Sequence, residues 1–258
     1  MSLELARAAL RAAGVPADGP VKAVKLGLSG DFVARVGWPL SCFIKIATKN
    51  RPELERELEA ARWLRGRAAV PKVLWAGEVE GFLAMITETL PGVPSSSLPK
   101  RDPSPGLVRC LGALAALHAL PADDCGLDRS LDTVLAIARA KIDHGEGDTA
   151  WFAEPWKDGD VEAIWQELLS LLPARPEPVF THGDACLPNF IVAPSGPVGL
   201  IDLGRAGLAD RHQDLALFRR SSLFNFPDLD IDALIACAYP HPVDEARMAF
   251  YLLLDEFF

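Results

Sequence analysis

The stretch that decides the fold is residues 179–209, VFTHGDACLPNFIVAPSGPVGLIDLGRAGLA. Short β-branched and aromatic runs at 179–180 and 190–192 precede the turn-forming residues 194–197. The run 198–201 predicts a returning strand, so we expect a tight hairpin. Such a hairpin brings the loop before it close to the loop after it.

Four polar side chains lie in these two loops. His182, Asp184 and Asn189 precede the hairpin, and Asp202 follows it. Two carboxylates and a carboxamide form an all-oxygen set, which suits a hard cation such as Mg²⁺ rather than zinc. Taken singly, Asp184 and Asn189 are more simply explained as residues that close turns.

The order of these motifs along the chain favours a functional role for Asp184 and Asn189 over a role in closing turns. A catalytic Asp, an Asn five positions later, a hairpin and then Asp-x-Gly is the order used by protein-kinase-like phosphotransferases. The segments THGDACLPN and IDLGRAGLADRHQD, together with the terminal FYLLLDEFF, resemble the motifs of the aminoglycoside 3′-phosphotransferases, kinases that inactivate antibiotics. The resemblance is specific in the last third of the chain and weaker in the first third.

Length and composition place the chain in a broad class. Its 258 residues, half of them hydrophobic, suffice for a substantial core. No apolar run approaches the roughly 18 residues that span a bilayer, and the N-terminus lacks a basic head before an apolar block. We therefore expect a soluble, cytoplasmic protein without membrane contact. Five cysteines, odd in number and without a CxxC pair, predict reduced thiols rather than disulfides or zinc ligands.

The formal net charge of −9 disfavours a nucleic-acid partner, which needs a basic surface. It favours a polycationic ligand, although an acidic balance is also ordinary for soluble proteins.

The first third predicts an antiparallel meander at 21–28, 31–36 and 40–46, after a helix at 2–13. In the third strand Lys45 points away from the aliphatic row, and without further context this pattern is more simply explained by a solvated lysine than by a cation facing a cleft. The helix at 51–66 places Glu57 within its apolar stripe, and a buried carboxylate needs a cationic partner. We therefore expect Lys45 and Glu57 to form the ion pair with which kinases hold ATP phosphates.

The resemblance supplies the remaining nucleotide contacts. It implies that Ser29 and neighbouring backbone amides cover the phosphates, although the chain has only a short turn there and no GxGxxG. After two more strands, at 72–76 and 82–87, it implies a hinge at residues 88–90, so Glu88 and Thr89 are expected beside the adenine. The proline-rich residues 91–106 predict a connector.

These observations predict an α+β, bilobal protein-kinase-like fold. An N-terminal nucleotide-binding lobe, 1–88, would hold a small antiparallel sheet with one helix between its strands. A larger, mainly helical C-terminal lobe, 89–258, would carry the catalytic and substrate residues. Helices are expected at 107–120, 130–142, 160–172, 209–220 and 243–258, with His118 as a satisfied core histidine.

The resemblance also assigns roles. Asp184 would orient the acceptor hydroxyl and take its proton, Asn189 and Asp202 would hold Mg²⁺, and His182 would support the loop. The substrate would be a polycationic aminoglycoside, phosphorylated by ATP at the 3′-hydroxyl. Its expected contacts are Asp148, Glu154, Arg220, Asp255, Glu256 and Phe258.

The acceptor is the least constrained part. After Arg220 the chain has Leu-Phe-Asn-Phe-Pro at 223–227, where the family commonly has a polar acidic segment. A kinase of the same fold acting on another alcohol or sugar therefore remains an alternative. So do a nucleotide-binding regulatory pseudokinase, although no expected ATP or metal residue is missing, and a metal-dependent hydrolase, which would leave Lys45 and Glu57 without a purpose. ATP and GTP, and monomer and dimer, are equally compatible with these residues.

Overall fold

The computed structural model describes residues 2–15, 19–24, 31–37, 41–48, 52–174 and 178–258. It divides into two compact units, residues 1–93 with 190–205, and residues 94–189 with 206–258. These units differ from the predicted lobes because the hairpin after Asn189 belongs to the first unit. The lobes at 1–88 and 89–258 stay a prediction about domains.

The first unit is built on a five-stranded antiparallel sheet of order β1-β2-β3-β5-β4. Its elements are α1 (Leu3–Ala12), β1 (Val21–Val24), β2 (Phe32–Val36), β3 (Cys42–Thr48), α2 (Pro52–Leu64), β4 (Val73–Val79), β5 (Phe82–Glu88) and the hairpin β8 (Phe190–Val192) and β9 (Gly199–Leu200). Helix α1 begins at its cap Ser2, whose side chain accepts from the backbone of Leu5.

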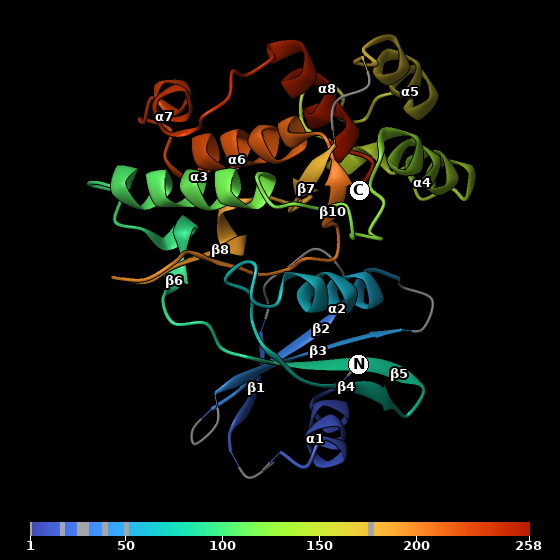
Figure 1. Ribbon diagram of the computed structural model, residues 1–258. Helices are drawn as coiled ribbons and strands as arrows, with labels where there is room; N and C mark the ends of the chain where they lie inside the picture. The colour runs from blue at the N-terminus through green and yellow to red at the C-terminus, as the bar shows by residue number, and fades with distance from the viewer. Residues whose placement is uncertain (1, 16–18, 25–30, 38–40, 49–51, 175–177) are drawn as a thin grey trace. The chain divides into compact units, whose positions relative to one another are not determined.

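Helices α1 and α2 cover opposite faces of this sheet (Figure 1). Leu10 of α1 packs with Ile44 and Ile46, whereas Leu54 of α2 packs with Ala47 on the other face. Because side chains alternate along a strand, Lys45 shares the α2 face. The predicted alternation in this strand is thus confirmed, and it directs the lysine toward the helix that carries Glu57.

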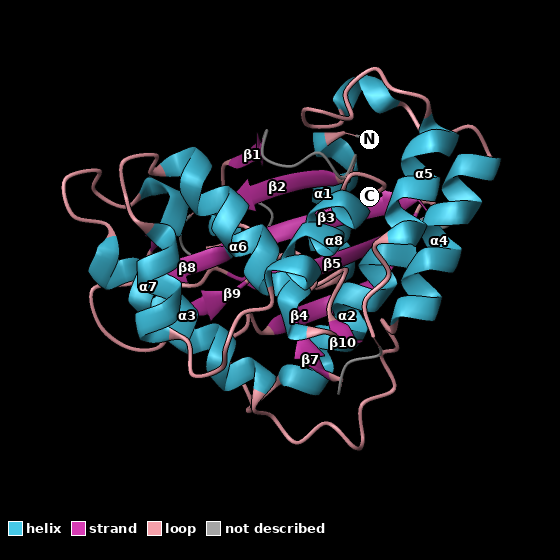
Figure 2. Ribbon diagram, turned by 90° about the horizontal axis from the view of Figure 1, so that it is seen from above, coloured by secondary structure: helices cyan, strands magenta, loops and turns pink. Residues whose placement is uncertain are grey.

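The second unit is mainly helical, with a short antiparallel pair of strands (Figure 2). Its elements are η1 (Ser95–Ser97), α3 (Ser104–His118), α4 (Leu131–Asp143), η2 (Thr149–Trp151), α5 (Val161–Ser170), β7 (Val179–Thr181), η3 (Leu187–Asn189), β10 (Gly207–Ala209), α6 (Arg211–Asn225), α7 (Ile231–Ala238) and α8 (Glu245–Asp255). Strand β6 (Val93–Pro94) lies at the junction of the units. Helix α6 packs against α7 and α8, and residues 212–218 are all buried.

The α+β class is confirmed, and three local features differ from the prediction. Helix α7 was not predicted, and α6 continues to Asn225 rather than ending at Arg220. The proline-rich connector is also partly core, because Ser95 is fully buried and its hydroxyl donates to the carbonyl of Leu187 at 2.7 Å. Among the described residues, no helix is long and apolar enough to cross a membrane.

Candidate active site

A three-residue ionic cluster lies in the first unit. Lys45 Nζ is 2.7 Å from Glu57 Oε2 and 2.8 Å from Asp202 Oδ1. The side chains of Lys45 and Glu57 are 15% and 11% exposed, whereas that of Asp202 is 42% exposed. The structure therefore places together the strand lysine and helix glutamate that the sequence paired, and adds Asp202 to them.

Within this cluster two carboxylates share the one ammonium of Lys45. Burial alone would lower the pKa of Lys45, but its ion pairs with Glu57 and Asp202 raise it overall. Burial raises the pKa of Glu57, against the opposing effect of Lys45, and the nearby Asp202 raises it further. The cluster can therefore accept more positive charge, and its most exposed member for that purpose is Asp202.

The backbone at Asp202 has an unusual conformation. Its φ of +62° lies in the left-handed region, which few residues other than Gly, Asn and Asp adopt. Asp202 directly follows the hairpin β8–β9, so this turn sets the direction of its side chain. Such conformations cost free energy and cluster at functional sites.

The loop after β7, in the second unit, is fixed by Asp214 of α6. The backbone N–H of His182 donates to Asp214 Oδ2 at 2.7 Å, and that of Gly183 donates to Oδ1 at 2.8 Å. Gln213 Nε2 donates to the carbonyl of Gly183 at 3.1 Å. Gly183 has φ +81°, a conformation in which glycine is unstrained. The backbone just before Asp184 is therefore fixed by hydrogen bonds to two of its N–H groups and to the Gly183 carbonyl.

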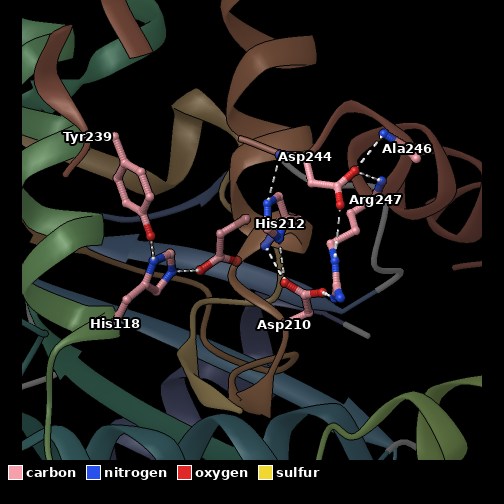
Figure 3. Close-up of polar contacts among 8 residues, drawn as sticks. His118, Asp210, His212, Tyr239, Asp244, Ala246 and Arg247 are labelled. Carbon is pink, nitrogen blue, oxygen red and sulfur yellow. Dashed lines mark hydrogen bonds and ion pairs between the residues drawn. The ribbon is translucent and has the colours of Figure 1, made fainter. Parts of the chain in front are cut away.

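Asp214 itself is fully buried and is supported from α3. His118 Nε2 lies 3.0 Å from Asp214 Oδ2, and His118 Nδ1 lies 2.6 Å from the Tyr239 hydroxyl, as Figure 3 shows for the latter pair. A carboxylate only accepts, so Nε2–H donates to Asp214; in the neutral imidazole Nδ1 then accepts from the Tyr239 hydroxyl. Burial alone would raise the pKa of Asp214, but the hydrogen bonds from His118 and from the backbone of His182 hold it below its ordinary value.

Asp184 and Asn189 contact each other directly within this loop. Asn189 Nδ2 donates to the Asp184 backbone carbonyl at 2.9 Å and to its Oδ2 at 3.0 Å. The Asn189 carbonyl oxygen Oδ1 is therefore the atom with which it can ligate a metal. The Asp184 backbone N–H donates to His182 Nδ1 at 3.3 Å, so His182 supports the loop as expected.

An ionic cluster of one arginine and two carboxylates joins α6 to the C-terminal end of α8. Arg220 Nη2 binds Asp255 Oδ2, and Arg220 Nη1 lies 3.1 Å from Glu256 Oε1. The other Glu256 oxygen accepts the backbone N–H of Ala153 at 2.8 Å. Burial raises the pKa of Glu256, against the opposing effects of this N–H and of Arg220. Three of the predicted substrate residues thus form one cluster.

The other predicted substrate residues have different side-chain contacts, although the Phe258 N–H donates to the Asp255 carbonyl at 3.0 Å. Asp148 caps η2 by accepting from the backbone of Ala150 at 3.1 Å, and Glu154 is exposed. The Phe258 ring lies 4.9 Å from Lys141 Nζ and 5.8 Å from Arg129 Cζ, both measured to the ring centroid.

At the predicted hinge, two backbone N–H groups are occupied. Glu88 donates to the carbonyl of Lys72 at 2.9 Å, and Thr89 donates to that of Ser41 at 3.3 Å. Their side chains also have partners, Lys72 at 3.9 Å and the Ser41 hydroxyl at 3.0 Å. An adenine base would therefore need a different backbone group here. Ser29 lies outside the described residues.

The sequence did not predict the contacts of Asp214 that hold the loop before Asp184. The sequence indicated only that His118 is satisfied in the core, and it linked neither His118 nor Asp214 to the loop. The available signal was the pair Gln213-Asp214, polar residues that directly precede the apolar run at 215–218.

A second polar network joins the starts of α6 and α8 (Figure 3). His212 Nδ1 lies 2.7 Å from Asp210 Oδ1, and His212 Nε2 accepts the backbone N–H of Asp244 at 3.1 Å. Arg247 Nη1 lies 2.5 Å from the other Asp210 oxygen. These contacts orient the helix that ends at Asp255.

Comparison with known proteins gives consistent results. A family model described as a phosphotransferase enzyme family matches residues 20–251. An aminoglycoside 3′-phosphotransferase from Niallia circulans is 35% identical over 241 residues, which cover 91% of each chain. Streptomycin 3″-kinase from Streptomyces griseus is 31% identical over 247 residues, which cover 90% of each chain.

Two solved structures extend the comparison to the fold. An aminoglycoside 3′-phosphotransferase of type VIII superposes with a TM-score of 0.86 at 33% identity, covering 97% of this chain and 98% of that chain. The aminoglycoside phosphotransferase APH(3″)-Id from Streptomyces rimosus, in complex with ADP and streptomycin, gives 0.81 at 25% identity, covering 100% and 98%.

Proposed function

Because the chain belongs to the phosphotransferase enzyme family, we propose that it transfers the γ-phosphoryl group of ATP to the 3′-hydroxyl of an aminoglycoside and so inactivates the antibiotic. The observation that carries the proposal is the contact of Lys45 with both Glu57 and Asp202. A strand lysine held by a helix glutamate, beside the Asp of an Asp-x-Gly, is the phosphate-binding arrangement of kinases. The similarity to named 3′-phosphotransferases over nine-tenths of both chains supports the acceptor class.

Lys45 would neutralise the phosphates of the nucleotide. In the free protein its ammonium is held by two carboxylates, which are anionic oxygens of the kind a phosphate presents. Glu57, nearly buried, would keep the lysine in place when Asp202 turns to the metal. This division follows from exposure, because Asp202 is the most exposed of the three side chains.

The residues present fit a magnesium ion. Mg²⁺ is typically bound by one or two protein oxygens together with substrate phosphates and water, and when bound it would neutralise charge on the phosphates. Asp202 and the carbonyl oxygen of Asn189 would supply the protein ligands. A site of this kind needs no larger protein cage, and the described residues hold no cluster of three or more His, Cys, Asp or Glu suited to a metal.

Asp184 would orient the acceptor hydroxyl and accept its proton. Its Oδ2 receives a hydrogen bond from Asn189, which fixes the rotation of the carboxylate. Its backbone is held through Asp214, so the carboxylate is pre-positioned at little entropic cost when the acceptor binds. Proton acceptance of this kind contributes about 10²- to 10⁴-fold to rate.

The acceptor would be recognised through its ammonium groups by the acidic residues at the end of α8. Asp255 is the best candidate for direct contact. The apolar departure at 223–227 leaves Phe224 86% exposed at the end of α6, while Phe226 is buried beneath Lys100. This apolar segment stands where a polar acidic one was expected, and that departure keeps another alcohol or sugar as the second candidate.

Release of ADP in the presence of MgATP and a panel of acceptors tests the proposal. We expect turnover with kanamycin-like compounds that carry a free 3′-hydroxyl, and binding without turnover for analogues that lack it. Turnover only with an uncharged alcohol would show that the acceptor is that alcohol and not an aminoglycoside. Nucleotide binding without any ADP release would indicate a regulatory module, and ADP release independent of every acceptor would indicate a hydrolase.

A further inference from the structure

The segment between Asp184 and Asn189 is held by side chains from outside the loop, and they act at Leu187. The Leu187 N–H donates to the Ser221 hydroxyl of α6 at 2.9 Å. The Leu187 carbonyl accepts a hydrogen bond from the Ser95 hydroxyl of η1 at 2.7 Å. Both polar backbone groups of this residue therefore bind serine side chains, which come from two elements far apart in sequence.

These bonds lie where water cannot replace them, because Leu187 is fully buried. Pro188 follows it and has no N–H, so the Leu187 carbonyl is the only polar group of the peptide between them. A buried carbonyl that loses its donor costs free energy. Ser95 is also fully buried, and η1 packs against both η3 and α3. The packing of η1 therefore fixes the Ser95 hydroxyl against the Leu187 carbonyl.

The turn η3 connects Leu187 with Asn189. The Asn189 N–H donates to the Cys186 carbonyl at 2.9 Å, which closes the turn around Leu187. The Asn189 side chain donates twice to Asp184, to its backbone carbonyl and to its Oδ2. A displacement of Leu187 would therefore move the Asn189 carboxamide relative to Asp184.

We propose that Ser95 and Ser221 are positioning residues, which hold the turn η3 and thereby the Asn189 carboxamide. In this position the carboxamide stays bonded to Asp184 and presents its Oδ1 to the metal. Asp214 fixes the loop before Asp184, and the two serines fix it after Asp184. The inference about the metal rests on the proposed function, whereas the inference about the turn does not.

The first measurement is amide hydrogen exchange, resolved by residue, in the full-length protein without metal or nucleotide. The Asn189 N–H reports on the turn, because it donates to Cys186 and to neither serine. Its exchange should become roughly fivefold faster or more in Ser95→Ala and in Ser221→Ala, the factor expected for the loss of one hydrogen bond. Thermal unfolding verifies that both variants fold.

Each alanine variant has a matched control in its own element. Ser222 of α6 is fully buried, and its hydroxyl makes no hydrogen bond within the described part of the chain. Ser97 of η1 is exposed. Ser222→Ala and Ser97→Ala should therefore leave the exchange of the Asn189 amide unchanged. Ser221→Thr keeps the hydroxyl at a half-buried position and should behave like the wild type.

The second measurement is calorimetric titration with ADP, with and without Mg²⁺. Ser95→Ala and Ser221→Ala should weaken ADP binding about tenfold in the presence of Mg²⁺, the size of effect typical when the groups that orient a metal ligand are removed. Without Mg²⁺ the affinity for ADP should stay unchanged. A general loss of stability would affect both titrations alike, so the difference between them identifies a positioning role.

Unchanged Asn189 exchange in either alanine variant would remove that serine from the role. Equal losses of ADP affinity with and without Mg²⁺ would overturn the inference about the metal ligand, and a Ser221→Thr variant as impaired as Ser221→Ala would overturn the role of the Ser221 hydroxyl. If the wild type bound ADP equally with and without Mg²⁺, the proposed function would fail instead. The exchange of the Asn189 amide would still decide whether the serines hold the turn.

Discussion

At the scale of single residues, the proposed chemistry depends on three carboxylates with different surroundings. Glu57 is nearly buried against Lys45, Asp202 is partly exposed beside the same lysine, and Asp184 is held by Asn189. Burial and partners therefore suit Glu57 to a structural role, Asp202 to a metal and Asp184 to the acceptor.

Asp184→Asn should leave ATP affinity nearly unchanged and reduce kcat by about 10² or more, because it removes the proton acceptor but keeps the shape. Calorimetric ATP binding and steady-state kinetics measure the two quantities. A variant that retains more than about a tenth of wild-type kcat would remove Asp184 from this role.

Asp202→Ala should abolish the magnesium-dependent part of nucleotide binding, since it removes the proposed carboxylate ligand. Titration of ATP with and without Mg²⁺ measures this difference. The same affinity for MgATP in variant and wild type would show that the metal is held elsewhere.

Lys45→Ala should weaken the binding of ATP more than the binding of adenosine, because the lysine is proposed to contact only phosphates. Glu57→Ala should do the same to a smaller degree. The double variant should be less than additive by at least about 0.5 kcal/mol, as for residues in contact. Adenosine is the internal control, and fully additive losses in ATP binding would contradict a shared function of the pair.

At the scale of elements, α6 organises the second unit. One end of this helix carries Asp214, which holds the loop before Asp184, and the other carries Arg220, which holds the end of α8. Almost every residue of its first two turns is buried, which explains why its sequence shows little amphipathic pattern. A polar residue inside such a helix must have an internal partner.

Asp214→Asn should lower the free energy of unfolding at pH 7 by about 3 kcal/mol, since an amide donor then faces donors of the loop or of His118. The folded pKa of Asp214 lies below the value of about 3.9 for an unfolded Asp. Its stabilising contribution is therefore complete above about pH 5 and is lost as pH falls through the unfolded pKa toward the folded pKa.

Urea unfolding of the wild type and Asp214→Asn between pH 3 and 7 measures this effect. The difference in stability should be constant above about pH 5 and shrink toward acid. Tyr239→Phe is the matched control, because it removes a neighbouring hydrogen bond but no carboxylate. Its loss in the free energy of unfolding should be smaller and should not change with pH. A pH-independent difference for Asp214→Asn would mean that its ionisation is not linked to folding.

The sequence predicted those features that depend on local periodicity. Alternation in β3 placed Lys45 on the face of α2, and helical spacing placed Glu57 opposite it. Features that depend on long-range packing were not predicted. Burial of Ser95 requires the Leu187 carbonyl. The position of His118 depends on Tyr239, which directly follows α7, a helix that the sequence pattern did not indicate.

At the scale of the whole molecule, the chain covers 91% of the Niallia circulans relative and 98% of the type VIII structure, so the similarity extends far beyond the motifs of the site. The fold is common to phosphotransferases with different acceptors. Acceptor choice therefore depends on individual site residues and on charge rather than on the fold.

The last prediction concerns that charge. A protein of formal net charge −9 attracts a polycationic acceptor at long range. Salt screens this attraction, with a Debye length of about 8 Å at physiological ionic strength, so kcat/KM for the acceptor should fall steadily as salt rises. KM for MgATP, an anion held by local contacts, should respond much less. Stopped or coupled assays from low to high ionic strength measure both parameters on the same protein.

An acceptor analogue with fewer amino groups is the control, because its salt dependence should be shallower in proportion to its charge. Asp255→Asn should also flatten the dependence for the full acceptor, whereas a surface variant such as Asp123→Asn, far from α8 in sequence, should flatten it only slightly. If acceptor kcat/KM were insensitive to salt while turnover remained, recognition would rest on hydrogen bonds to hydroxyl groups, and an uncharged sugar would become the better substrate candidate.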